Sequence, residues 1–268
     1  SAMIQFEAEA NENGNRNVDE QYVDVSGAFG KLRMGEKSGI FESFAVRAPD
    51  VGEVSPDDTV SVWLNQNTGM NLTTGSMDTT YDDDSLRVSY VTPSFYGFSA
   101  GVSYAPKPSG NLADRRGAGV PTGDSFRDEV QFGMALDTEL AGVGVKADGV
   151  AMTEAADNDS WAYRGGLELS YAGFAVGGSY MGNEGKDFRD ASVWEAGASY
   201  TTGPYAVSFT YAESDALDDG TSYKLAGAYE MGPGVKVVGN VFYANIDEDS
   251  TGNYRSGMGA VTGLVLSF

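Results

Sequence analysis

The sequence predicts an all-β chain that forms an antiparallel, up-and-down transmembrane β-barrel of about fourteen strands. Three observations support this fold class. Apolar and polar residues alternate with a period of two along most of the chain. Short turns alternate with long polar segments without a break. Helical periodicity is weak everywhere, and no stretch approaches the ~20 apolar residues of a membrane-spanning helix.

The alternation gives each predicted strand one apolar and one polar face. In the range 86–90, for example, Leu86, Val88 and Tyr90 share one face, and Arg87 and Ser89 share the other. The clearest such ranges are 4–8, 86–90, 98–104, 130–136, 161–171 and 205–211.

The connections follow a second rule that orders the strands. Short turns are expected near 27–30, 93–97, 141–142, 172–173, 203–204 and 232–234. Longer polar segments cover 11–19, 37–84, 106–126, 154–160, 184–191, 214–221 and 246–254. In an up-and-down meander this alternation places all tight turns at one end and all long loops at the other.

The composition of the two faces favours a barrel in lipid over a soluble sandwich. A sandwich would show a polar outer face rich in Lys, Glu and Thr. Here the polar face is mostly Gly, Ser and Ala with a few charges, and the apolar face carries Leu, Val, Phe and Tyr. A closed barrel pairs every backbone group in the membrane, with lipid outside and water inside. A soluble β-rich binding protein is the weaker alternative.

Aromatic residues at predicted strand ends are typical of the girdles at a membrane interface. They are Tyr104, Trp161, Tyr171, Phe174, Tyr180, Trp194, Tyr200, Tyr205, Tyr211, Tyr223, Tyr229 and Tyr243. Ordinary strand preference for Tyr is the simpler alternative explanation.

Charge and missing residue types exclude several function classes. The chain has 268 residues, 39 acidic and 17 basic, and a formal net charge of -22, which argues against a nucleic-acid partner. It has no Cys and no His, so it lacks thiolate sites and the usual general base. We therefore expect no enzyme and no cofactor, with one exception for calcium given below.

Two segments resemble the Gram-negative general porins of the alphaproteobacterial type. The last strand, 257–268, alternates and ends on Phe268, like the C-terminal strand that the outer-membrane insertion machinery reads. The range 17–35 contains a Ser26-Gly27-x-Phe29-Gly30-Lys31 turn similar to an early porin hairpin.

The resemblance implies one transmembrane barrel over 1–268, in the bacterial outer membrane. The family has sixteen strands, so either about two N-terminal strands lie outside this sequence or the barrel closes with fewer. Residues 1–3 read as a tag remnant or a trimmed start. The implied partners are small hydrophilic solutes and ions, outer-membrane lipid and lipopolysaccharide, and two further copies in a homotrimer.

The resemblance also implies that one long loop folds into the lumen and narrows it. The equivalent segment here is 37–84, in which Pro49 and Pro56 flank a group of carboxylates. We expect the loop side of the constriction to carry Asp50, Glu53, Asp57 and Asp58. By the alternation, the basic side of the wall carries Lys31, Arg33, Arg87, Lys146, Arg164 and Lys224. Opposed charges of this kind create a transverse field that favours small polar solutes.

The acidic excess predicts a mild preference for cations. Acidic runs also offer oxygen ligands for Ca²⁺ in the loops, at Asp82, Asp84, Asp247 and Asp249. The spacing fits no EF-hand, and mutually repelling solvated charge is the simpler explanation.

The leading interpretation of the whole sequence is a passive diffusion channel. A structural or adhesive barrel with an occluded lumen is the alternative.

Overall fold

The computed structural model describes residues 2–6, 20–52, 85–108, 128–155, 160–185, 191–215, 219–248 and 255–267. Within these ranges the chain is almost entirely β-strand. The one helix among them is the short α1 (Ile40–Ser43). In the same ranges, no helix has the length and apolar character needed to cross a bilayer.

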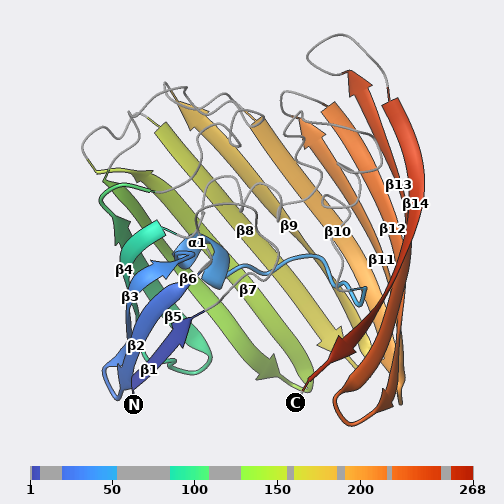
Figure 1. Ribbon diagram of the computed structural model, residues 1–268, viewed down its shortest axis with the longest axis horizontal. Helices are drawn as coiled ribbons and strands as arrows, with labels where there is room; N and C mark the ends of the chain where they lie inside the picture. The colour runs from blue at the N-terminus through green and yellow to red at the C-terminus, as the bar shows by residue number, and fades with distance from the viewer. Residues whose placement is uncertain are drawn as a thin grey trace.

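Fourteen strands form one continuous antiparallel sheet, in which each strand pairs with the next along the chain (Figure 1). Their bounds are β1 (Ala2–Phe6), β2 (Gln21–Gly27), β3 (Gly30–Lys37), β4 (Ser85–Val91), β5 (Phe98–Ala105), β6 (Glu129–Leu140), β7 (Val143–Glu154), β8 (Ser160–Tyr171), β9 (Phe174–Gly185), β10 (Ala191–Thr202), β11 (Tyr205–Asp215), β12 (Asp219–Gly232), β13 (Val235–Glu248) and β14 (Arg255–Leu266). The predicted up-and-down order and strand number are confirmed. β1 and β14 are the edge strands, and no pairing joins them within the described ranges.

The tight turns lie at the predicted positions and share one end of the sheet, the lower end in Figure 1. The β6–β7 and β8–β9 turns have two residues each. Ala141 and Gly142 have φ of 52° and 83°, and Ala172 and Gly173 have φ of 49° and 87°. Two consecutive positive φ values are typical of the type I′ turn, whose twist matches that of the strands it joins.

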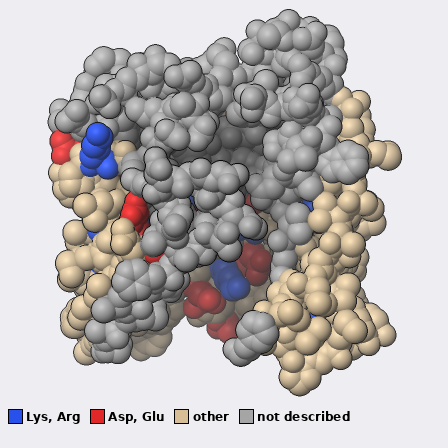
Figure 2. Space-filling model, viewed as in Figure 1, with Lys and Arg blue, Asp and Glu red and all other residues tan. Residues whose placement is uncertain are grey.

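The two faces of the sheet differ as the alternation predicts. Large apolar side chains such as Leu86, Leu167 and Leu225 are 67%, 48% and 51% exposed on the outer face. Arg87, Ser103 and Lys224 are buried on the inner face. Figure 2 shows acidic and basic atoms side by side low in the central recess, beside a right flank that is almost entirely uncharged. The rows of apolar side chains therefore point outward, to the side that faces lipid in a membrane barrel.

Outer-face aromatic residues form two rows, one at each end of the strands. Near the turns, the rings of Phe174 and Tyr200 and those of Tyr205 and Tyr229 are in tilted contact, with centroids 4.3 and 5.1 Å apart. Toward the opposite end, Trp194, Tyr211, Tyr223 and Tyr243 form a chain of contacts across β10 to β13. This arrangement is that of interfacial girdles.

Residues 38–52, which we call the inner strap, follow β3 and cross the concave face of the sheet (Figure 1). The strap begins with α1, whose Ile40 and Phe41 are buried against Val150 and Met152 of β7. It then continues without regular structure toward β13. The described part of the predicted long loop, residues 38–52, thus lies against the inner wall.

Candidate functional site: the inner strap and the channel wall

The strap begins over a buried polar cluster on β4, β5 and β6. Arg87 Nη1 donates to Glu129 Oε1 at 3.1 Å, and Gln131 Nε2 donates to the same oxygen at 2.8 Å. The side chains of Arg87 and Glu129 are fully buried. A Cβ on Gly39 would lie 2.1 Å from Gln131 Oε1 and 2.2 Å from Arg87 Nη1. Glycine at position 39 thus lets the backbone approach this cluster directly.

Arg164 and Asp148 hold the next part of the strap. Arg164 donates from Nη1 to the carbonyl of Phe41 and from Nη2 to the carbonyl of Val46, both at 3.3 Å. Its Nε lies 3.3 Å from Asp148 Oδ2, and the amide of Val46 donates to Asp148 Oδ1 at 2.9 Å. A Cβ on Gly166 would lie 2.0 Å from the Val46 carbonyl oxygen, so the strap rests directly on this glycine.

Glu195 of β10 holds the middle of the strap. Its Oε1 accepts the amide of Ala48 at 3.0 Å and the hydroxyl of Ser179 at 2.9 Å. A Cβ on Gly197 would lie 3.2 Å from the Cβ of Ala48. A wall carboxylate thus satisfies a buried strap amide, which would otherwise carry a desolvation cost of about 1–3 kcal/mol.

The far end of the strap reaches β11, β12 and β13. Asp50 forms an ion pair with Lys224 and accepts from Ser208 at 3.3 Å. The amide of Val51 donates to Ser208 Oγ at 3.1 Å. A Cβ on Gly52 would lie 2.8 Å from the Cβ of Ala226. The strap is therefore anchored at four successive places, from β4 to β12, and reduces the open cross-section along this path.

Of the four loop carboxylates expected at the constriction, the structure describes one. Asp50 lies on the inner wall in direct contact with Lys224. Glu53, Asp57 and Asp58 lie outside the described residues, so their placement stays a prediction.

Each of the predicted wall cations lies on the inner face of its strand, as the cross-strand pairing shows. Arg87, Arg164 and Lys224 are buried beneath or beside the strap. Arg33 donates to both oxygens of Asp24 at 2.7 and 2.8 Å, and its guanidinium lies 4.2 Å from the ring centre of Tyr22. Lys31 is exposed beside the start of the strap.

The wall cations lie near carboxylates rather than opposite them across open water. Lys146 is about half exposed and lies 3.8 Å from Glu168. Arg87, Arg164, Arg33 and Lys224 contact their acidic partners directly. The described charges thus serve mainly to fix the strap and the wall.

The sequence analysis missed the wall groups that accept the strap amides. Gln131, Asp148, Glu195 and Ser208 accept from the strap backbone, and none was singled out. Each occupies an inward position in a strand, where a polar side chain needs a partner. The alternation of the sequence therefore already indicated that these four polar side chains face inward. Arg47 on the strap, which interacts electrostatically with Asp148, carried no such signal.

The other predicted positions lie outside the described side chains. They are the expected Ca²⁺ ligands Asp82, Asp84, Asp247 and Asp249, and the terminal Phe268. Among the side chains that the structure describes, no group of three or more acidic residues has a metal-binding arrangement. The loop calcium site stays a prediction, tested by thermal stability with and without a chelator.

Comparisons with known proteins agree with this architecture. The sequence profile of the Gram-negative porin family matches residues 1–251. No curated protein sequence matches the chain significantly.

Solved porin structures share its fold at low sequence identity. OmpF of Salmonella typhi, solved with daunomycin, is 17% identical with a TM-score of 0.63, covering 98% of this chain and 85% of that one. A mutant of the Rh. blastica porin is 13% identical with a TM-score of 0.60, covering 97% and 82%. The anion-selective porin of Comamonas acidovorans is 17% identical with a TM-score of 0.56, covering 93% and 77%.

The predicted transmembrane barrel is thereby confirmed, since the sheet order, the outward apolar face and the solved neighbours all agree. The family profile covers most of the chain, and the proteins of this family are channels rather than enzymes. This chain belongs to the Gram-negative porin family and forms a channel in the bacterial outer membrane.

Proposed function

We propose that this porin is a passive diffusion channel for small hydrophilic solutes, narrowed by the inner strap and mildly selective for cations. The observation that carries the proposal is the path of residues 38–52 across the inner wall, with anchors from Gln131 on β6 to Lys224 on β12. A solute that enters the barrel must pass this segment.

Cation preference follows from the charge balance. Acidic residues exceed basic residues by 39 to 17. Several inner-wall cations are already in contact with carboxylates, so they contribute little free positive potential. The excess carboxylates therefore raise the local concentration of cations, and the effect weakens as salt screens it.

The test is a reversal potential in a planar bilayer under a salt gradient. We expect the potential to have the sign of cation selectivity, and its magnitude to fall as the ionic strength rises on both sides. A potential with the sign of anion selectivity would contradict the proposal.

The same recordings separate the channel from a structural barrel with an occluded lumen. An open channel gives discrete conductance steps, whereas an occluded barrel gives none. A homotrimer, which we propose from the family resemblance, predicts three equal closing steps for each inserted complex.

A further inference from the structure

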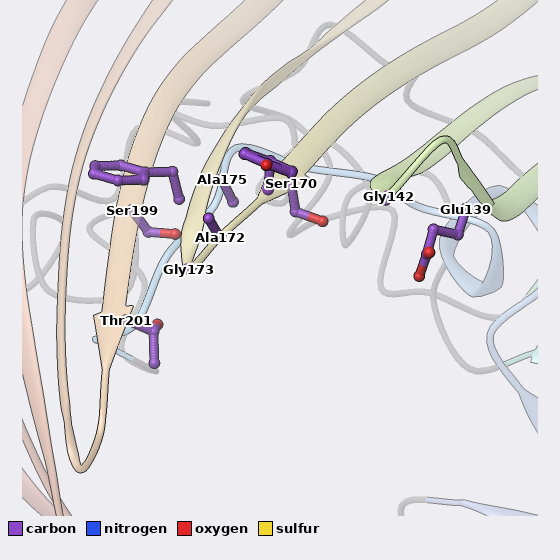
Figure 3. Close-up of a pocket in the computed structure, with 11 residues that line it drawn as sticks. Glu139, Gly142, Ser170, Ala172, Gly173, Ala175, Ser199 and Thr201 are labelled. Atoms are coloured by element: carbon purple, nitrogen blue, oxygen red, sulfur yellow. The ribbon is translucent and has the colours of Figure 1, made fainter.

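A hollow lies at the turn end of the wall, away from the strap, where inward residues meet the outer-face Tyr171 and Phe174. Its volume is about 420 Å³, and Figure 3 shows side chains from several neighbouring strands around its open space. Its inward lining includes Glu139, Gly144, Ser170, Ala175, Ser199 and Thr201. The strap anchors described above use none of these residues.

Small inward side chains form the hollow. Gly144, Ser170, Ala175 and Ser199 are consecutive cross-strand partners from β7 to β10. Ser170 is six residues from Arg164 on β8, an even spacing that places both on the inner face. A row of four small residues removes volume from the wall, and the hydroxyls of Ser170 and Ser199 supply donors and acceptors.

The charges around the hollow are mainly negative. Glu139, a lining residue, is the cross-strand partner of Gly144. One inward position closer to the strap, Lys146 of β7 has two acidic cross-strand partners, Asp137 of β6 and Glu168 of β8. These two rows of cross-strand partners thus hold three carboxylates and one lysine, and the Nζ of that lysine is 3.8 Å from Glu168. A positively charged solute is favoured here.

The arrangement favours an organic cation over a metal ion. In the described part of the chain, acidic side chains do not converge in a metal-binding group. The hollow instead offers one carboxylate at its margin and several separated hydroxyls, with room for a molecule larger than an ion. Such a lining suits a ligand that carries one ammonium group and several hydroxyls.

The hollow lies on the turn side of the strap anchors. Gly144 is four residues from Asp148 along β7, which corresponds to about 13 Å in a strand. A solute that leaves the constriction toward the turn end passes this end of the wall.

We propose that this hollow is a solute-binding subsite for small polyhydroxylated ammonium compounds, with Glu139 binding the ammonium group and Ser170, Ser199 and Thr201 binding the hydroxyls. The inference rests on the channel function, but not on the proposed preference for cations. It makes Glu139 a specificity-determining residue for passage.

The experiment uses glucosamine as the probe and glucose as its neutral match, at a pH where the amine is protonated and carboxylates are ionised. In bilayer recordings, glucosamine should reduce the ion current in a saturable manner. Glucose at the same concentrations should cause only the small, non-saturating reduction expected from volume exclusion.

Variants locate the site. Glu139→Gln should raise the half-blocking concentration of glucosamine about threefold to fivefold, the range of an exposed charge contact. Ser199→Leu should abolish saturation, because a large side chain fills the hollow. Glu230→Gln is the matched control, since Glu230 also faces inward near the turns, on β12, opposite Lys236. It removes the same charge and should leave the half-blocking concentration unchanged.

Equal effects of glucosamine and glucose on the wild-type channel would overturn the proposal. So would a Glu230→Gln effect as large as that of Glu139→Gln, because general electrostatics would then explain the block. Normal saturation in Ser199→Leu would overturn it as well.

If the cation preference fails while glucosamine block persists, the subsite stands and the proposed selectivity alone is wrong. A wild-type protein without conductance steps would contradict the channel function itself.

Discussion

The two ends of the inner strap are held by different kinds of interaction. At the start, Ile40 and Phe41 are buried in an apolar cluster above the fully buried Arg87–Glu129 pair. At the far end, Asp50 is 28% exposed and is held by Lys224 and Ser208. Both charges are fully buried at the first end, whereas at the second end Lys224 is buried and Asp50 remains open to solvent. The far end is therefore the part of the strap that salt should weaken.

The largest effect is expected from Arg87→Ala at the buried end. Removal of one partner leaves Glu129 buried without its guanidinium, which costs about 3–5 kcal/mol. Urea unfolding of the detergent-solubilised protein measures this loss. The comparison variant is Arg33→Ala. The ion pair of Arg33 with Asp24 is partly exposed, so its loss should lower the free energy of unfolding clearly less than Arg87→Ala does.

A double variant distinguishes charge burial from loss of packing. Arg87→Met combined with Glu129→Gln removes both charges and keeps most of the volume, so it should recover much of the lost stability. A double variant as unstable as Arg87→Ala would contradict the assignment of an unpaired buried charge.

A conductance change is expected from Gly166→Val in the middle of the strap. The new Cβ would lie 2.0 Å from the Val46 carbonyl oxygen, a backbone atom, so the strap must move off the wall. Single-channel recordings should show an altered step size. Gly165→Val is the matched control, since its Cβ faces the other side of β8 and would be no closer than 3.4 Å to its nearest neighbour. Equal step sizes in the two variants would show that the strap does not rest on Gly166.

The smallest effect is expected from Asp50→Asn at the exposed end. It removes the charged partner of Lys224, and because the Asp50 side of this pair is open to solvent, the loss of stability should be smaller than at the fully buried Arg87–Glu129 pair. The expected result is greater open-channel current noise at low salt, with little difference from wild type at high salt. Glu230→Gln removes an equal charge away from the strap and should leave the noise unchanged. Noise in Asp50→Asn that is independent of salt would contradict an electrostatic anchor.

The fold could be predicted because the sheet repeats a simple rule. Alternation identifies the face of each residue, and turn chemistry at sites such as Ala141–Gly142 fixes the strand order. Arg87, Arg164 and Lys224 were placed on the inner face for the same reason.

The pairing of strap and wall could not be predicted in the same way. Val46 and Asp148 are 102 residues apart, and Asp50 and Lys224 are 174 residues apart. No local pattern specifies such contacts, because they depend on the path of an irregular segment over the curved wall. The close approach at Gly166 has the same origin, since a glycine in a strand has several possible causes.

The central claim is that residues 38–52 lie against the inner wall of the working channel. The most direct measurement is a disulfide between Ala48→Cys and Gly197→Cys, in a chain that has no other cysteine. The Cβ positions lie 3.2 Å apart, slightly under the usual disulfide range of about 3.5–4.5 Å, so a small strap shift would accommodate the bond. We predict that the bond forms under mild oxidation and leaves the single-channel conductance close to that of the wild type. Failure of the bond to form, or a large conductance change when it does, would contradict the position of the strap.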